Sequence, residues 1–147
     1  MKKFFAIIFL ACILLVSCSK NTTDINANVD TVSNFLQKNG FFTDRTSKEV
    51  TAYNDYTTQI VYIYDKNAKN YIKQMVRDLK KSKEVQDLSV SKSQQCYYCK
   101  DSLINEYYRL NNNNLVVVKT TESLDKIIKI LGKLDLGIPE KKEEGDK

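Results

Sequence analysis

Two cysteines three positions apart, Cys96 and Cys99, are the residues of this chain whose type and spacing are best suited to chemistry. A Cys-x-x-Cys pair can support thiol–disulfide exchange or bind a metal, and a thiol in the first turn of a helix has a lowered pKa. With Ser93 as the N-cap, the sequence predicts that Cys96 occupies such a turn. The pair also fits an apolar stripe with Leu103 and Leu110, which favours a structural role instead.

Three features argue against a redox enzyme or a zinc site at this pair. The chain has no tryptophan before the motif, and its one proline, Pro139, lies near the C-terminal end, so two features of thioredoxin-like proteins are missing. A structural zinc site needs four Cys or His ligands, and the chain has no histidine. We therefore favour a local disulfide between Cys96 and Cys99 in an oxidising compartment over reduced buried thiols, and both over redox catalysis or metal binding.

The absence of histidine also removes the commonest general base and every Ser-His-Asp or Cys-His pair. The sequence contains no Gly-rich phosphate-binding loop. Glu122 and Asp125 could act as an acid and a base. Carboxylates at such positions are more typical of a first helical turn, where their negative charge stabilises the helix by interacting with the positive end of its dipole. The sequence therefore predicts a protein that is not an enzyme and that holds no metal or cofactor.

The first 17 residues have the layout of a secretion signal. Lys2 and Lys3 precede an unbroken apolar run over residues 4–16. A membrane-spanning helix needs about 20 apolar residues, so this shorter run fits the apolar region of a signal peptide better. At its end, the residues Leu-Val-Ser-Cys at 15–18 resemble the lipobox of bacterial lipoproteins.

The resemblance to bacterial lipoproteins implies that the Cys18 thiol receives a diacylglycerol and that the signal at 1–17 is cut before it. Two or three acyl chains hold a protein stably at a membrane. The resemblance thus predicts a cell-envelope protein anchored through Cys18. Ser19, rather than Asp, follows the cysteine, and the analogy with enterobacterial lipoproteins then favours the outer membrane, on its surface or periplasmic side, over the inner membrane.

The composition of the mature chain limits its partners. Residues 1–17 contain two lysines and no acidic residue, so the remaining 130 residues carry 21 basic and 18 acidic side chains, a net charge of +3. This mixed charge does not match the dense basic stripe of a nucleic-acid-binding protein. Together with the lipobox, the abundance of Lys, Asn, Ile and Tyr is similar in style to the outer-surface lipoproteins of Borrelia-type spirochaetes.

The mature chain divides into three parts. Residues 18–28 are polar and predict a flexible tether, and residues 139–147 predict a charged disordered tail. Residues 29–138 are long enough for one small domain. Because the chain has only four glycines and one proline, it offers few turn residues for a protein of many strands.

Four segments of this domain show apolar residues at helical spacing, and we therefore expect a mainly α fold, a small bundle of about four amphipathic helices. The apolar positions are Val29, Val32, Phe35 and Leu36; Ala68, Tyr71, Ile72, Met75, Val76 and Leu79; Cys96, Cys99, Leu103, Tyr107 and Leu110; and Leu124, Ile127, Ile128, Leu131 and Leu134. Residues 57–64 and 115–118 are rich in β-branched and aromatic side chains. They predict either a short two-stranded β element, in an α+β alternative, or extensions of the helices that follow.

The nine tyrosines indicate how such a domain would work, since tyrosine is enriched at protein interfaces. The adjacent pairs Tyr97–Tyr98 and Tyr107–Tyr108 cannot both point into one core from a helix, so we expect one of each pair at the edge. The leading hypothesis is a lipid-anchored, non-enzymatic domain that binds a protein or other macromolecule. The alternatives are a periplasmic thiol–disulfide protein using Cys96 and Cys99, and a small immunity or exclusion factor of the envelope.

Overall fold

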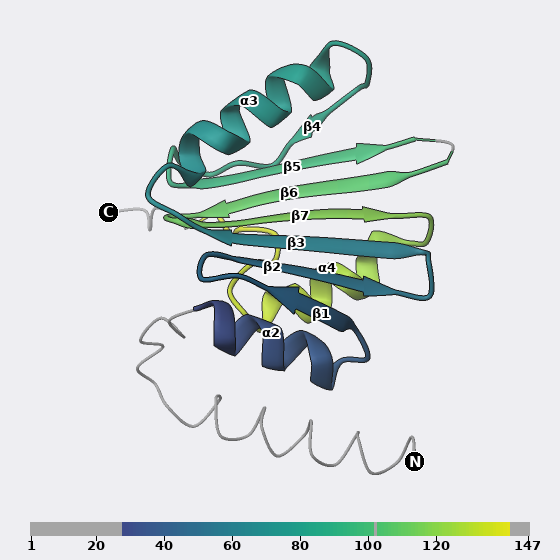
Figure 1. Ribbon diagram of the computed structural model, residues 1–147. Coiled ribbons are helices and arrows are strands. Elements are labelled where there is room, and N and C mark those ends of the chain that lie inside the picture. The colour runs from purple at the N-terminus through teal and green to yellow at the C-terminus, as the bar shows by residue number, and fades with distance from the viewer. Residues whose placement is uncertain (1–27, 102, 142–147) are drawn as a thin grey trace.

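A computed structural model of the chain describes residues 28–101 and 103–141. In this part the chain forms a seven-stranded, fully antiparallel sheet with helices on both faces, in the order β1-β2-β3-β7-β6-β5-β4 (Figure 1). The strands are β1 (Phe42–Arg45), β2 (Glu49–Asn54), β3 (Thr58–Tyr64), β4 (Gln86–Asp87), β5 (Gln94–Lys100), β6 (Asn105–Asn111) and β7 (Asn114–Thr120). The helices are α2 (Val29–Lys38), α3 (Ala68–Lys80) and α4 (Leu124–Gly132).

The expectation of a mainly helical bundle is therefore wrong. The helices expected near 29–38, 68–80 and 124–134 are present, but the third expected helix is the hairpin of β5 and β6. Of the segments 57–64 and 115–118, residues 58–64 form β3 and residues 115–118 lie in β7, and these strands pair with each other in the centre of the sheet. The signal peptide at 1–17, Cys18 and the tether up to residue 27 lie outside the described residues.

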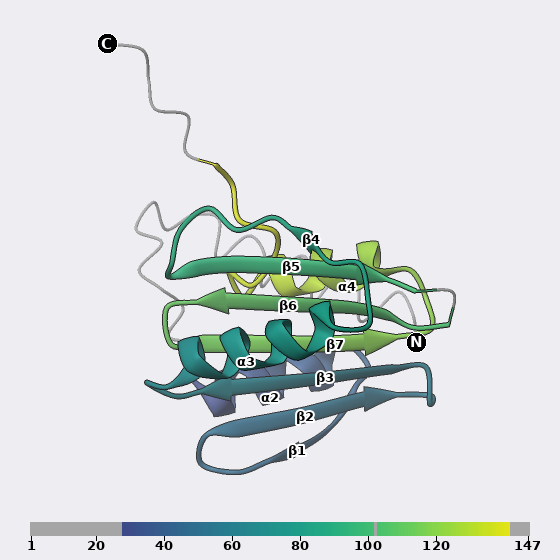
Figure 2. The same cartoon turned by 90° about the horizontal axis from the view of Figure 1, so that it is seen from above.

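The two faces of the sheet differ in how they are covered. Face A is the side on which α2 and α4 pack, and face B is the side on which α3 packs (Figures 1 and 2). The core on face A is the larger one, with strand residues Val50, Ala52, Ile60, Tyr62, Cys96, Tyr107, Val116 and Val118. The core on face B uses Cys99, Tyr108, Leu110, Leu115 and Val117. Strands β6 and β7 are thus buried on both faces, which explains their nearly continuous apolar sequence.

The turns of the sheet are built mostly without glycine. Asp55 and Tyr56 adopt φ values of 38° and 62° at the tip of the β2–β3 hairpin, and Asn112 adopts 55° between β6 and β7. Asn and Asp tolerate this left-handed backbone better than other non-glycine residues. The low glycine count therefore did not exclude a many-stranded fold.

Among the described residues, no helix is both long enough and apolar enough to span a membrane.

The segment after α4 lies against the sheet, because side chains of β6 donate hydrogen bonds to the backbone of this segment. The Tyr107 hydroxyl donates to the Leu136 carbonyl at 2.9 Å, and Asn111 Nδ2 donates to the Asp135 carbonyl at 2.9 Å. These bonds fix residues 135–137 against β6.

Candidate functional site

The two cysteines of the Cys-x-x-Cys motif lie on β5 and point to opposite faces of the sheet. Cys96 belongs to the core on face A and Cys99 to the core on face B, and both are buried free thiols. Three residue steps along a strand separate their α-carbons by about 10 Å, whereas a disulfide requires less than about 7 Å. The expected Cys96–Cys99 disulfide is therefore not formed, and the structure corrects that prediction.

The environment of these thiols also differs from that of a redox site. Cys96 is in a strand and not in the first turn of a helix, so no helix dipole lowers its pKa. Burial raises the pKa of both the Cys96 and the Cys99 thiol above the ordinary value. Within residues 28–101 and 103–141, no group of three or more Cys, Asp or Glu residues is placed to hold a metal ion.

A small network of charged side chains lies beside Cys99 on face B. Lys83 Nζ contacts Glu106 Oε2 at 2.7 Å and Asp101 Oδ2 at 3.6 Å, while Tyr108 donates to Glu106 Oε1 at 3.0 Å. Burial raises the pKa of the Glu106 carboxyl, but the hydrogen bonds from Lys83 and Tyr108 outweigh that effect and the pKa lies below its ordinary value. Glu106 is thus an ion-paired carboxylate. Through Lys83 it fixes the loop after α3, and its lowered pKa does not suit it to accept a proton.

The structure also locates the second tyrosine pair, Tyr107–Tyr108, and the two candidate carboxylates. Tyr107 and Tyr108 are both buried, one on each face of the sheet, so the expectation that one would lie at the edge is wrong for this pair. Asp125 lies in the first turn of α4, as expected of a helix-start carboxylate. Glu122 is exposed and lies outside the helix.

The half of face B formed by β1, β2 and β3 is largely uncovered. Helix α3 packs against β6 and β7, and Figure 2 shows β1 and β2 with no helix over them on this side. We call this surface the open face; its side chains are Phe42, Asp44, Glu49, Thr51, Tyr53, Gln59 and Val61. Half of a sheet face is therefore available for contact with another molecule.

Aromatic rings mark one end of the open face. Phe42 and Tyr53 are cross-strand partners, 65% and 45% exposed, and their rings stack with centroids 5.9 Å apart. Tyr56, at the adjoining hairpin tip, is fully exposed and has a left-handed backbone that bulky residues rarely adopt. Exposed aromatic side chains held in fixed positions are typical of binding surfaces.

The open face continues into a hollow beside α3. This hollow has a volume of about 250 Å³ and is lined by Gln59, Val61, Met75, Tyr108, Val117 and Lys119. Met75 comes from α3, and the other lining residues come from β3, β6 and β7. The surface is therefore stepped, with the helix as a wall at one side, and can accept a protruding side chain.

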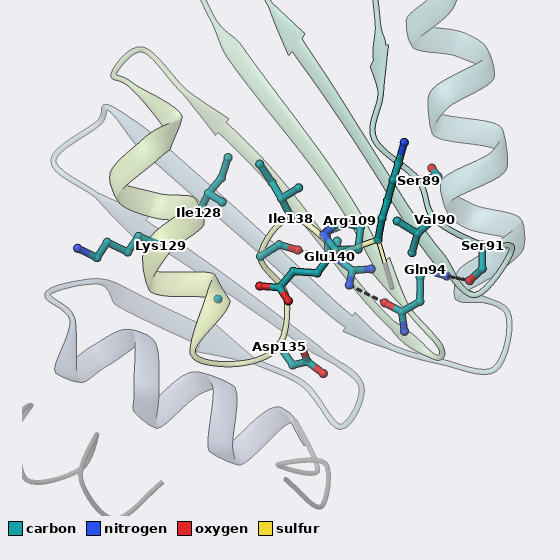
Figure 3. A pocket seen from close by; sticks show the side chains of 14 residues that line it. Ser89, Val90, Ser91, Gln94, Arg109, Ile128, Lys129, Asp135, Ile138 and Glu140 are labelled. Atoms are coloured by element: carbon teal, nitrogen blue, oxygen red, sulfur yellow. Dashed lines mark hydrogen bonds between the residues drawn. The ribbon is translucent and has the colours of Figure 1, made fainter. Parts of the chain in front are cut away.

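A second concave region lies on face A, where the chain leaves α4. We call it the C-terminal pocket; it has a volume of about 1370 Å³ (Figure 3). Its walls come from the loop before β5, the end of α4 and the segment 135–141. Arg109 of β6 lies at its base, only 2% exposed. Figure 3 shows the guanidinium beside Gln94 and the segment that carries Ile138 and Glu140.

Comparison of the chain with family models, curated proteins and solved structures finds no match. The candidate sites therefore depend on geometry alone. Neither the open face nor Arg109 was among the residues singled out from the sequence. Signals for both are nevertheless present, since Glu49, Thr51 and Tyr53 alternate with the buried Val50 and Ala52, and Arg109 is a charged residue flanked by the apolar Tyr107, Tyr108 and Leu110.

Proposed function

We propose that this protein is a membrane-anchored lipoprotein whose non-enzymatic domain binds a protein partner through the open face. The lipid anchor is Cys18, and the expected location is the cell envelope, with the outer membrane favoured. The observation that carries the proposal is the exposed, stacked pair Phe42–Tyr53 on an uncovered half-sheet. Contiguous exposed apolar surface of this kind marks interaction sites in soluble domains.

The direction in which the chain enters the domain supports this proposal. An ion pair between Arg45 and Asp30 holds the start of α2 at the Arg45 end of β1. Phe42 and its partner Tyr53 lie at the other end of β1, three residue steps or about 10 Å from Arg45. A tether that enters at Asn28 would therefore leave the aromatic end facing away from the membrane.

The chemistry of the open face indicates what the partner should offer. Phe42, Tyr53 and Val61 provide apolar contact area, and the carboxylates of Asp44 and Glu49 lie beside them. A complementary surface would have apolar side chains at its centre and basic side chains at its rim, because opposite charges at a rim steer association. A partner protein with an apolar, basic patch fits this description.

Site-specific photo-crosslinking in the producing cells tests the proposal. A photoreactive amino acid replaces Thr51 on the open face or, as a control, Lys73 on the solvent side of α3. We expect a discrete protein adduct at Thr51, lost in a Phe42→Ser background, and none at Lys73. Equal adducts at both positions, or a Thr51 adduct that Phe42→Ser leaves unchanged, would overturn the proposal.

A further inference from the structure

The buried arginine at the base of the C-terminal pocket has only neutral hydrogen-bond partners among the described residues. Arg109 Nε donates to the Gly137 carbonyl at 2.7 Å, and Nη2 donates to Gln94 Oε1 at 2.5 Å. Nη1 donates to the carbonyls of Leu110 and Gln95. No carboxylate in residues 28–101 and 103–141 forms an ion pair with it, and Asp135 acts on it only through a longer-range electrostatic interaction. A buried cation is normally paired with an anion, because neutral dipoles alone compensate little of its lost hydration.

The surrounding structure fixes this guanidinium in place. Gln94 Nε2 donates to Asn111 Oδ1, so the amide oxygen of Gln94 is turned toward Arg109. Gly137 approaches the helix end so closely that a Cβ there would lie 3.0 Å from Gly132 Cα. The carbonyl that accepts from Arg109 Nε is thus held by a tight backbone contact. A guanidinium has five N–H donors, and the described contacts use four, which leaves one donor on Nη2.

The walls of the pocket combine apolar and basic side chains. Apolar surface comes from Val90, Ile128, Ile138 and Pro139. Lys129 of α4 also lines the pocket and is exposed, and in Figure 3 its ammonium extends away from Arg109, so it adds a second positive charge only at the outer rim.

The remaining charged lining residues are Asp135, Glu140 and Lys141, all exposed. Asp135 directs its carboxylate to Asn111 Nδ2 at 3.1 Å. Of the ionisable groups that line the pocket, Arg109 is the buried one, so the charge at its base is positive.

We propose that the C-terminal pocket binds a small organic anion, with an oxyanion head group at Arg109 and an apolar body against Val90, Ile128 and Ile138. The head group supplies the direct anionic partner that Arg109 lacks among residues 28–101 and 103–141, and it accepts from the remaining Nη2 donor. Carboxylate and phosphate both have this chemistry, because a guanidinium pairs with either. The site lies on face A, so it is separate from the open face and does not depend on the function proposed there.

Titration of the mature protein with octanoate, heptyl phosphate and the neutral octanamide tests this inference without any substitution. Calorimetry or chemical-shift changes report binding, and all three probes have the same heptyl chain. We expect the anionic probes to bind at least tenfold more tightly than octanamide. Equal affinity for the anionic and neutral probes, or no binding of either anion at millimolar concentration, would overturn the proposal.

Two variants locate the binding on the protein. Arg109→Met should abolish the preference for an anion, and a far-ultraviolet spectrum with a melting curve checks that it still folds. Lys129→Gln, which keeps the buried contacts intact, should weaken octanoate binding by about threefold, and the matched control Lys126→Gln, one turn away on α4, should leave it unchanged. Equal effects of the Lys129 and Lys126 substitutions, or an unchanged preference in folded Arg109→Met, would contradict the assignment.

Discussion

At the scale of single residues, the two free cysteines show how strand geometry decides chemistry. The Cys-x-x-Cys spacing brings two thiols together only where the backbone turns, as in the first turn of a helix. On β5 the same spacing places Cys96 and Cys99 on opposite faces, each in its own core. The thiols therefore act as small apolar side chains, and burial keeps them protonated by raising their pKa.

Thiol titration of the purified mature protein gives the first prediction. Without reductant, a thiol reagent should label neither Cys96 nor Cys99 appreciably in the folded protein at pH 8, because both are buried and protonated. After unfolding in denaturant, still without reductant, it should label both. Labelling of the unfolded protein only after a reductant is added would reveal a disulfide and contradict this geometry.

The ion pair of Glu106 gives the second prediction. Glu106→Gln removes the charged acceptor of Lys83 in a buried position and should lower the free energy of unfolding by roughly 2 kcal/mol at pH 7. Glu84→Gln, at an exposed position, should change it by less than about 0.5 kcal/mol. Chemical denaturation measures both variants.

The pH dependence of this effect has a defined sign. The folded-state pKa of Glu106 lies below the ordinary value of 4.5, so its contribution to stability is complete above that value. The contribution is lost as the pH falls through the folded pKa. The stability difference between wild type and Glu106→Gln should therefore be constant from pH 6 to 8 and shrink below about pH 4. A difference that grows on acidification would show that the carboxyl is protonated in the folded state.

At the scale of elements, the sequence predicted the helices well and the strands poorly. The stripes of α2, α3 and α4 each have one apolar and one polar side, which is the pattern of a helix against a sheet. The prediction for the β5–β6 hairpin was wrong because this hairpin is buried on both faces. Cys96 and Tyr107 pack in the core on face A, while Cys99 and Leu110 pack in the core on face B. Apolar residues on both faces lose the period of two that identifies a strand.

Packing of α4 gives the third prediction. Leu131 is 1% exposed in the core on face A, and its truncation to alanine should cost about 2–5 kcal/mol in unfolding free energy. Lys126 on the exposed side of the same helix should tolerate alanine within about 0.5 kcal/mol. Similar shifts in melting temperature for Leu131→Ala and Lys126→Ala would mean that the faces of α4 are assigned incorrectly.

The candidate sites themselves could be predicted only in part from the sequence. The alternation of exposed and buried residues along β2 could have predicted an outward-facing Tyr53. Its stacking on Phe42 could not, because that contact depends on the β1–β2 register. The same holds for Arg109, whose partners come from β5 and from the segment after α4.

At the scale of the whole molecule, the proposed function joins a lipid anchor to a sheet with one uncovered half. Lipidation requires the Cys18 thiol, so Cys18→Ser should move the protein from the detergent phase to the aqueous phase, or leave the signal uncut. Phase partitioning with an N-terminal mass determination distinguishes these outcomes. A variant found in the detergent phase with its signal removed would exclude the lipoprotein interpretation.

If the open face binds a partner protein, that partner covers Phe42 and Tyr53 in the cell. Hydroxyl-radical footprinting compares the oxidation of aromatic side chains in purified protein and in native membranes of the producing cells. Phe42 and Tyr53 lie on the open face, whereas the exposed Tyr64 lies on the opposite face of β3 and serves as an internal control. We expect Phe42 and Tyr53 to be oxidised several-fold less in membranes than in the purified protein, with Tyr64 unchanged. Equal oxidation of Phe42 and Tyr53 in the two preparations would contradict the proposed function.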